Sequence, residues 1–275
     1  MSEKKSAETK EKENALKWPW LLRIAPRTII TIILIWLAIA WLGVLAVDIY
    51  GWVDPGLDRP LWRLLFNDRP IEWTQWFLLV FAIAASGYLA GRLDSERRGK
   101  VARFFFLFAI GLGLMMIEDA GDIRHTLSRE VERLFGSRIL GFRHNFIVEV
   151  PYFAAIASVP LYALAKYGKY VWEYTRTRYY LIVGFVLYGM AAVGSALSNV
   201  AHSYVFIGAL IDIALFGERL PTLEGRSQGF TYFLFTDSAV EESIELLAIT
   251  AFVAALLAFA HTMRKKNRSA SPVKS

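Results

Sequence analysis

Residues 241–261 read EESIELLAITAFVAALLAFAH, a run that opens on acids and then continues from 246 to 260 without a charged side chain. A helix needs about 20 mainly apolar residues to cross the hydrocarbon core of a bilayer. Comparable stretches recur along the 275-residue chain. We count six candidate spans, at 28–47, 73–92, 103–119, 146–165, 179–200 and 239–261. The sequence therefore predicts an all-α, polytopic integral membrane helical bundle of six transmembrane helices.

The composition supports this fold class and limits the chemistry. Hydrophobic residues make up 55% of the chain, and its mean hydropathy of +0.38 is higher than that of an ordinary soluble domain. Cysteine is absent, which excludes thiolate ligands, iron–sulfur clusters and disulfides. Membrane lipids are the expected partners, and we expect no nucleic acid because topology accounts for the net charge of +6. The oligomeric state stays open.

The lysines predict the orientation of the bundle. Every lysine lies in the tails or in the turns at 94–100 and 166–178, which share one side if the number of spans is even. Both termini are therefore expected in the cytoplasm, with the bundle in the cell (inner) membrane. Arginines in the opposite loop, at 124–143, weaken this charge bias. We expect a disordered tail at 1–17, a six-span domain at 18–263 and a basic disordered tail at 264–275.

Acids and histidines gather at the outer, non-cytoplasmic ends of four spans. Glu118 closes the third span, Glu149 opens the fourth and His202 follows the fifth. The sixth span begins with Glu241, Glu242 and Glu245, while the inner ends of these helices carry mostly Lys and Arg. Ionisable groups at membrane depth are costly and usually mark function. The sequence thus locates a candidate site in the third to sixth spans.

A metal site is one interpretation of this pattern. Carboxylates and imidazoles suit zinc, manganese, iron or calcium as a divalent cofactor, and helical bundles use Glu-x-x-His motifs to hold metals. The chain offers the approximation Asp122-x-x-His125, on one helical face if the third helix continues through Gly121. The candidate ligands are Glu118, Asp122, His125, Glu149, His202 and Glu245.

An acid–base site is the other form of the same hypothesis, and two alternatives compete with it. In a membrane-embedded enzyme, Glu118, Glu241 or Glu242 would act as the catalytic general base. The adjacent acids Glu241 and Glu242 repel each other enough to favour protonation of one, which also suits a proton- or cation-coupled transporter or channel. A structural or partner-binding membrane protein is the second alternative, since Arg124 and Arg143 can pair with the acids.

Three further segments carry expectations. The outer loop at 124–142 has the apolar spacing of an amphipathic helix lying on the bilayer, where its arginines could meet the phosphate of a lipid or another ion ligand. The apolar run at 204–216 is too short to span, so it is interfacial, re-entrant or an extension of the fifth helix. Ser238 is expected to cap the sixth helix.

Overall fold

The computed structural model describes residues 18–54, 56–57, 59–67, 70–139 and 142–270, which form mainly helices, with one pair of two-residue strands. The predicted tail at 1–17 lies outside the described residues. The elements are, in chain order, η1 (Trp20–Arg23), α2 (Pro26–Val44), η2 (Leu45–Ile49), α3 (Leu61–Phe66), α4 (Pro70–Ser95), α5 (Gly99–Gly121), α6 (Ile123–Phe135), β1 (Arg138–Ile139), β2 (Phe142–Arg143), α7 (His144–Trp172), α8 (Thr175–Ala201), α9 (Ser203–Ile211), η3 (Asp212–Phe216), α10 (Gln228–Phe235), η4 (Thr236–Glu241) and α11 (Glu242–Ala270).

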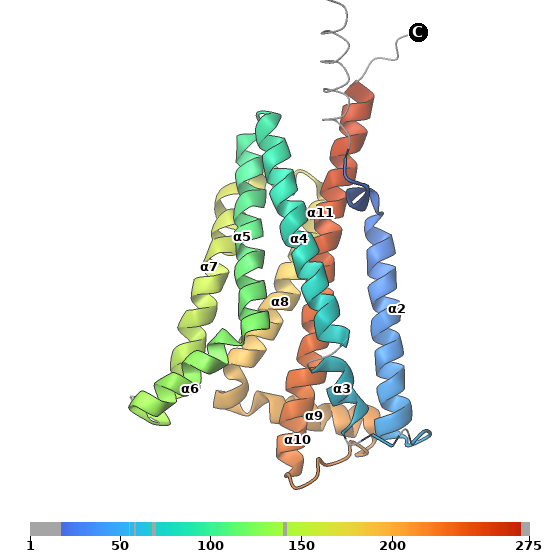
Figure 1. Cartoon of the computed structure of the whole chain (residues 1–275), viewed down its shortest axis with the longest axis vertical. Coiled ribbons are helices and arrows are strands. Elements are labelled where there is room, and N and C mark those ends of the chain that lie inside the picture. The colour runs from blue at the N-terminus through green and yellow to red at the C-terminus, as the bar shows by residue number, and fades with distance from the viewer. Residues whose placement is uncertain (1–17, 55, 58, 68–69, 140–141, 271–275) are drawn as a thin grey trace, which may run out of the picture.

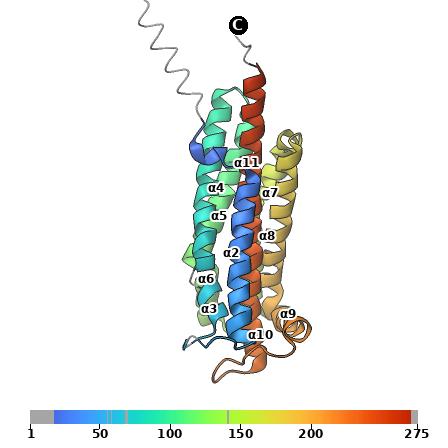
Figure 2. The same cartoon turned by 90° about the vertical axis from the view of Figure 1, so that its right-hand side faces the viewer.

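Within the part of the chain that the structure describes, six helices are long and apolar enough to cross a membrane. The predicted number of spans is therefore confirmed, and the fold fits an integral multi-pass membrane protein. Figures 1 and 2 show the long helices side by side, with η1 and the last turns of α11 at the same end of the bundle. We call the opposite end the acidic end, because the candidate site residues lie there.

Helix α11 forms the centre of the bundle. Its residues from 251 to 260 are all buried, as expected for a helix that is apolar on every face. It packs against α2, α4 and α8, while α5 packs between α4 and α7. The helix continues to Ala270, past the tail boundary predicted at 264.

Two short helices turn away from the bundle axis at the acidic end. Helix α6 follows α5 after Asp122, and α9 follows α8 after His202 and runs across the end of the bundle (Figure 1). Both turning residues have left-handed backbones, with φ of 45° and 50°. The expected helical stripe from Glu118 to His125 is therefore wrong, because α5 ends at Gly121. The run at 204–216 forms a separate helix rather than an extension of α8.

The sixth span starts earlier than predicted. It runs from Gln228 through α10, the π-helical segment η4 and α11, so the acids lie within a helix rather than at its start. Ser227 caps this helix by accepting a hydrogen bond from the Phe230 amide at 3.3 Å. The capping role expected for Ser238 is wrong, because its hydroxyl is buried and donates to Asn67 Oδ1 at 3.2 Å.

Close packing of α9 on α10 depends on Gly208. A Cβ at this position would lie 2.5 Å from the Tyr232 carbonyl oxygen and 2.9 Å from Thr236 Oγ1. We expect Gly208→Ala to lower the free energy of unfolding by about 1–3 kcal/mol, because the backbone of α10 cannot move aside without cost. Thermal denaturation in detergent measures the loss.

Gly91→Ala is the matched control for this change. Its Cβ would meet no atom within 4 Å, so replacing a helical glycine there is expected to be neutral or slightly stabilising. Equal denaturation midpoints for the two variants would contradict the close contact between α9 and α10.

Candidate functional site

The acidic end contains a cavity of about 400 Å³. It opens between the ends of α4, α5 and α11 and the start of α6. Eight carboxylic acids line it, namely Glu72, Glu118, Asp119, Asp122, Asp237, Glu241, Glu242 and Glu245. The basic side chains in the lining are Arg124 and His125. We call this the acidic cavity. The predicted gathering of acids from several helices therefore exists as one lined space.

Helix α4 supplies the hydrogen-bond donors for two of the acids. The side-chain amide of Gln75 donates to Glu245 Oε2 at 2.8 Å and to Asp119 Oδ2 at 3.3 Å. The Trp76 indole N–H donates to the same Asp119 oxygen at 2.9 Å. Gln75 is only 2% exposed, and its own carbonyl oxygen meets no donor among the described residues. This amide thus bridges two carboxylates while keeping one acceptor unused.

Glu241 ends the π-helical segment η4 and accepts a hydrogen bond from Tyr204. The Tyr204 hydroxyl, on α9, lies 2.5 Å from Glu241 Oε2. The pKa of this hydroxyl is raised mainly by the burial of Tyr204 and secondly by the nearby charge of Glu241. Tyr204 therefore stays protonated and remains a donor at neutral and alkaline pH. Short π-helical segments are frequent at functional sites, because they shift the side chains that follow around the helix.

Glu242 has a buried carboxylate oxygen without a hydrogen-bond donor among the described residues. Its Oε2 is buried and has no hydrogen-bond partner in the part of the chain that the structure describes. Its neighbours Glu241 and Glu245 are each hydrogen-bonded, by Tyr204 and Gln75 respectively. A buried acceptor without a donor is costly, so Glu242 is the group best placed to hold a proton or meet a ligand.

Arg124 is the half-buried cation of the cavity. It contacts three elements: its Nε lies 3.6 Å from Glu118 Oε1, its Nη1 donates to Ser195 Oγ at 2.7 Å, and its guanidinium covers the Phe153 ring at 4.9 Å. Burial opposes its charge, but the surrounding acids, chiefly Glu149 and Glu241, raise the pKa of the guanidinium. Arg124 therefore stays charged and ties α6 to α5, α7 and α8.

The predicted metal ligands are only partly brought together. Asp122 and His125 form an exposed pair at the rim, with His125 Nδ1 2.5 Å from Asp122 Oδ1. Glu149 is buried on α7 and His202 is exposed at the turn into α9, and neither lines the cavity. Among the described residues, no group of three or more His, Asp and Glu side chains is arranged to hold a metal ion. Four of the six predicted ligands, Glu118, Asp122, His125 and Glu245, therefore share the acidic cavity, whereas Glu149 and His202 do not line it.

The sequence-based candidates Glu118, Glu241, Glu242 and Glu245 all line the acidic cavity. Their partners Gln75 and Tyr204 were not predicted, and neither was Trp76, the partner of Asp119, because none of these residues is charged and two come from a helix outside the expected site. A glutamine in an apolar span was the available signal for Gln75. Arg124 was predicted as an ion-pair partner of the acids, and its contact with Glu118 confirms that pairing.

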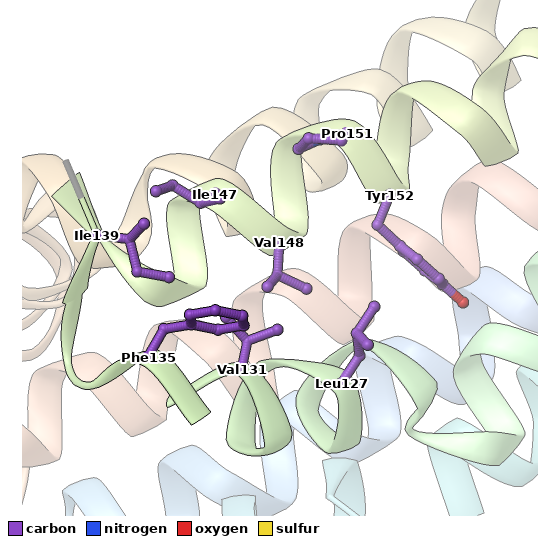
Figure 3. Close-up of a pocket in the computed structure, with 8 residues that line it drawn as sticks. All are labelled: Leu127, Val131, Phe135, Ile139, Ile147, Val148, Pro151 and Tyr152. Atoms are coloured by element: carbon purple, nitrogen blue, oxygen red, sulfur yellow. The ribbon is translucent and has the colours of Figure 1, made fainter. Parts of the chain in front are cut away.

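An apolar groove lies beside the acidic cavity, between α6 and α7. Figure 3 shows Leu127, Val131 and Phe135 of α6 facing Ile147 and Val148 of α7, with Tyr152 at one end. The predicted amphipathic helix at 124–142 is confirmed as α6 as far as Phe135, but its last part is wrong, because Arg138 and Ile139 form a β-strand that pairs with Phe142 and Arg143. The apolar face of α6 turns toward α7, where the Ser128 hydroxyl donates to Asn145 Oδ1 at 2.6 Å.

A second apolar cavity, of about 140 Å³, lies deeper in the bundle. Helices α5, α7, α8 and α11 line it, and Glu118, Phe153 and Tyr188 line both this cavity and the acidic cavity. The two spaces therefore adjoin at these three side chains. Comparison of the chain with protein-family models, curated proteins and solved structures found no match.

Proposed function

We propose that the acidic cavity is an acid–base site in which Glu242 takes up and releases protons. The observation that carries this proposal is the unpartnered, buried Glu242 Oε2 between two hydrogen-bonded acids. Carboxylates crowded in a poorly hydrated place cannot all stay ionised, so protons are shared among them. Such a group can serve as the general acid or base of a membrane-embedded enzyme.

The geometry favours this proposal over proton or cation transport. Transport requires a polar route that continues from the acidic cavity toward the other end of the bundle. On the side of Glu118 and Tyr188 that faces away from the acidic end, the adjoining cavity is lined by apolar residues such as Leu112, Ile156 and Phe252. An apolar wall of this kind suits a site that opens to one side of the membrane.

We further propose that the acidic end faces away from the cytoplasm and that both termini are cytoplasmic. Lys100, in the first turn of α5, and Lys166 and Lys169, in the last turns of α7, all lie at the other end of the bundle. Cytoplasmic loops carry an excess of lysine and arginine. Cysteine labelling of single-cysteine variants in intact cells tests this orientation, because the natural chain has no cysteine.

Removal of the Glu242 carboxyl group tests the acid–base proposal. Infrared difference spectra of the purified protein are expected to show a protonated carboxyl C=O band that decreases as the pH is raised. Glu242→Gln should remove about one protonated carboxyl group from that titration, because the coupled acids share their protons.

Glu130→Gln is the matched control, since Glu130 is exposed on α6 and pairs only with Arg133 among its described contacts. A titrating band of the same size in both variants would overturn the role of Glu242. Proton flux into liposomes that Glu242→Gln abolishes would instead favour the transport alternative.

A further inference from the structure

The adjoining cavities differ sharply in polarity. The acidic cavity presents carboxylates, whereas the deeper cavity presents mostly apolar side chains. Glu118, Phe153 and Tyr188 belong to both linings, so the two spaces meet at these side chains. A ligand that fits them must be polar at one end and apolar at the other.

The apolar cavity has the form of a site for a chain. Phe108 and Glu118, both on α5, line this cavity. Because a helix rises by about 1.5 Å per residue, the cavity extends along α5 for about 15 Å. Pro160 and Phe252 line its far end, and Gly189 leaves room along one wall. A Cβ at Gly189 would meet no atom within 4 Å. Leu161 lines this cavity and is 52% exposed, so the cavity lies close to the side surface of the bundle.

The acidic cavity selects the charge of the polar end. Acids outnumber cationic side chains in its lining, which favours a cation and opposes an anion by charge complementarity. Glu242, which lines this cavity, also has a buried acceptor, Oε2, that meets no donor among the described residues. An alkylammonium group brings three N–H donors and no acceptor, so it can satisfy acceptors of this kind.

We propose that the two cavities together bind a single-chain amphiphile with an amine headgroup. The ammonium lies among Glu242, Glu245 and Asp119, and the alkyl chain lies between α5, α7 and α8. This inference rests on the proposed acid–base site and names its substrate class. Glu242 can exchange a proton with the bound amine, because the two groups meet directly.

Other occupants fit the cavities less well. A fatty acid would place a second carboxylate among the acids, where like charges repel. A small cation alone would bind in the acidic cavity and leave the apolar cavity empty. A short amine would satisfy the acidic cavity but would gain nothing from the apolar walls.

Photolabelling tests the proposal on the full chain in phosphatidylcholine nanodiscs. The probe is dodecylamine carrying a diazirine in its alkyl chain, and labelled peptides are identified by mass spectrometry. We expect labels on the segments of α5, α7 and α8 that line the apolar cavity. Excess dodecylamine should compete with the probe, whereas dodecanoate and butylamine should not.

Two variants make the assignment specific. Gly189→Leu fills the apolar cavity and is expected to reduce cavity labelling by about tenfold or more. Gly91→Leu is its control, because Gly91 also has open space at its Cβ but does not line the cavity. Glu242→Gln should reduce the labelling as well, by weakening the site for the ammonium.

Competition by dodecanoate equal to that by dodecylamine would overturn the proposal, as would unchanged labelling in Gly189→Leu. Labels spread over lipid-facing residues of α2 would also overturn it. Failure of amine binding is distinguishable from failure of the acid–base site: the infrared titration of Glu242 would then persist while specific labelling is absent. Loss of both signals would reject both proposals.

Discussion

Replacing Arg124 by methionine is expected to lower the free energy of unfolding by about 3–5 kcal/mol, because it leaves buried acids without their cation. The side chain of Arg124 is 15% exposed and contacts Glu118, Ser195 and Phe153. A loss of this size corresponds to a fall of about 10 °C in the midpoint of thermal denaturation. Circular dichroism in detergent measures the midpoint.

Arg129→Met is the control, one helical turn further along α6. The Arg129 side chain is 70% exposed and its nearest described acid, Asp122, lies at 3.8 Å. Exposed ion pairs contribute little, so the midpoint of this variant should match that of the unmodified chain. An equally mild effect of Arg124→Met would show that the acids do not depend on Arg124.

Replacing Phe252 by alanine is expected to cost about 3–5 kcal/mol, through the cavity that it leaves in the centre of the bundle. Phe252 is 1% exposed, and its ring lies 5.2 Å from that of Phe108 and 5.1 Å from that of Phe185. Such packing is a main source of helix association in membranes. The same change enlarges the apolar cavity, because Phe252 lines it.

Phe106→Ala provides the comparison, because Phe106 lies on α5 and is 57% exposed. Truncating an exposed side chain usually changes stability by less than about 0.5 kcal/mol. Chemical denaturation of both variants in the same detergent measures the difference. Equal stabilities would contradict the central position of α11.

The number of spans could be predicted because it depends on the length of each apolar run. The bounds of the sixth span could not. The sequence resembles a helix start at Thr236, Asp237 and Ser238. These residues nevertheless lie inside a continuous helix, because they form part of the π-helical segment η4. Polar residues inside a span therefore look like its boundary.

The position of the acids could also be predicted, but their partners could not. Glu241 and Glu245 share one end of the bundle because helix direction and depth place them there. Gln75 and Tyr204 reach them only through the packing of α4 and α9, which no local pattern encodes. His202 lies apart from the acidic cavity for a related reason, because the chain turns at that residue, with a left-handed φ of 50°, into a separate helix.

The left-handed turns at Asp122 and His202 affect how mutations of either residue should be interpreted. Histidine, asparagine and aspartate adopt this backbone more readily than most residues, whereas alanine is strained there. An alanine scan would therefore record backbone strain at both positions and attribute it to the lost side chain. Glycine tolerates positive φ without strain, so Asp122→Gly and His202→Gly are the substitutions that isolate side-chain chemistry at these two turns.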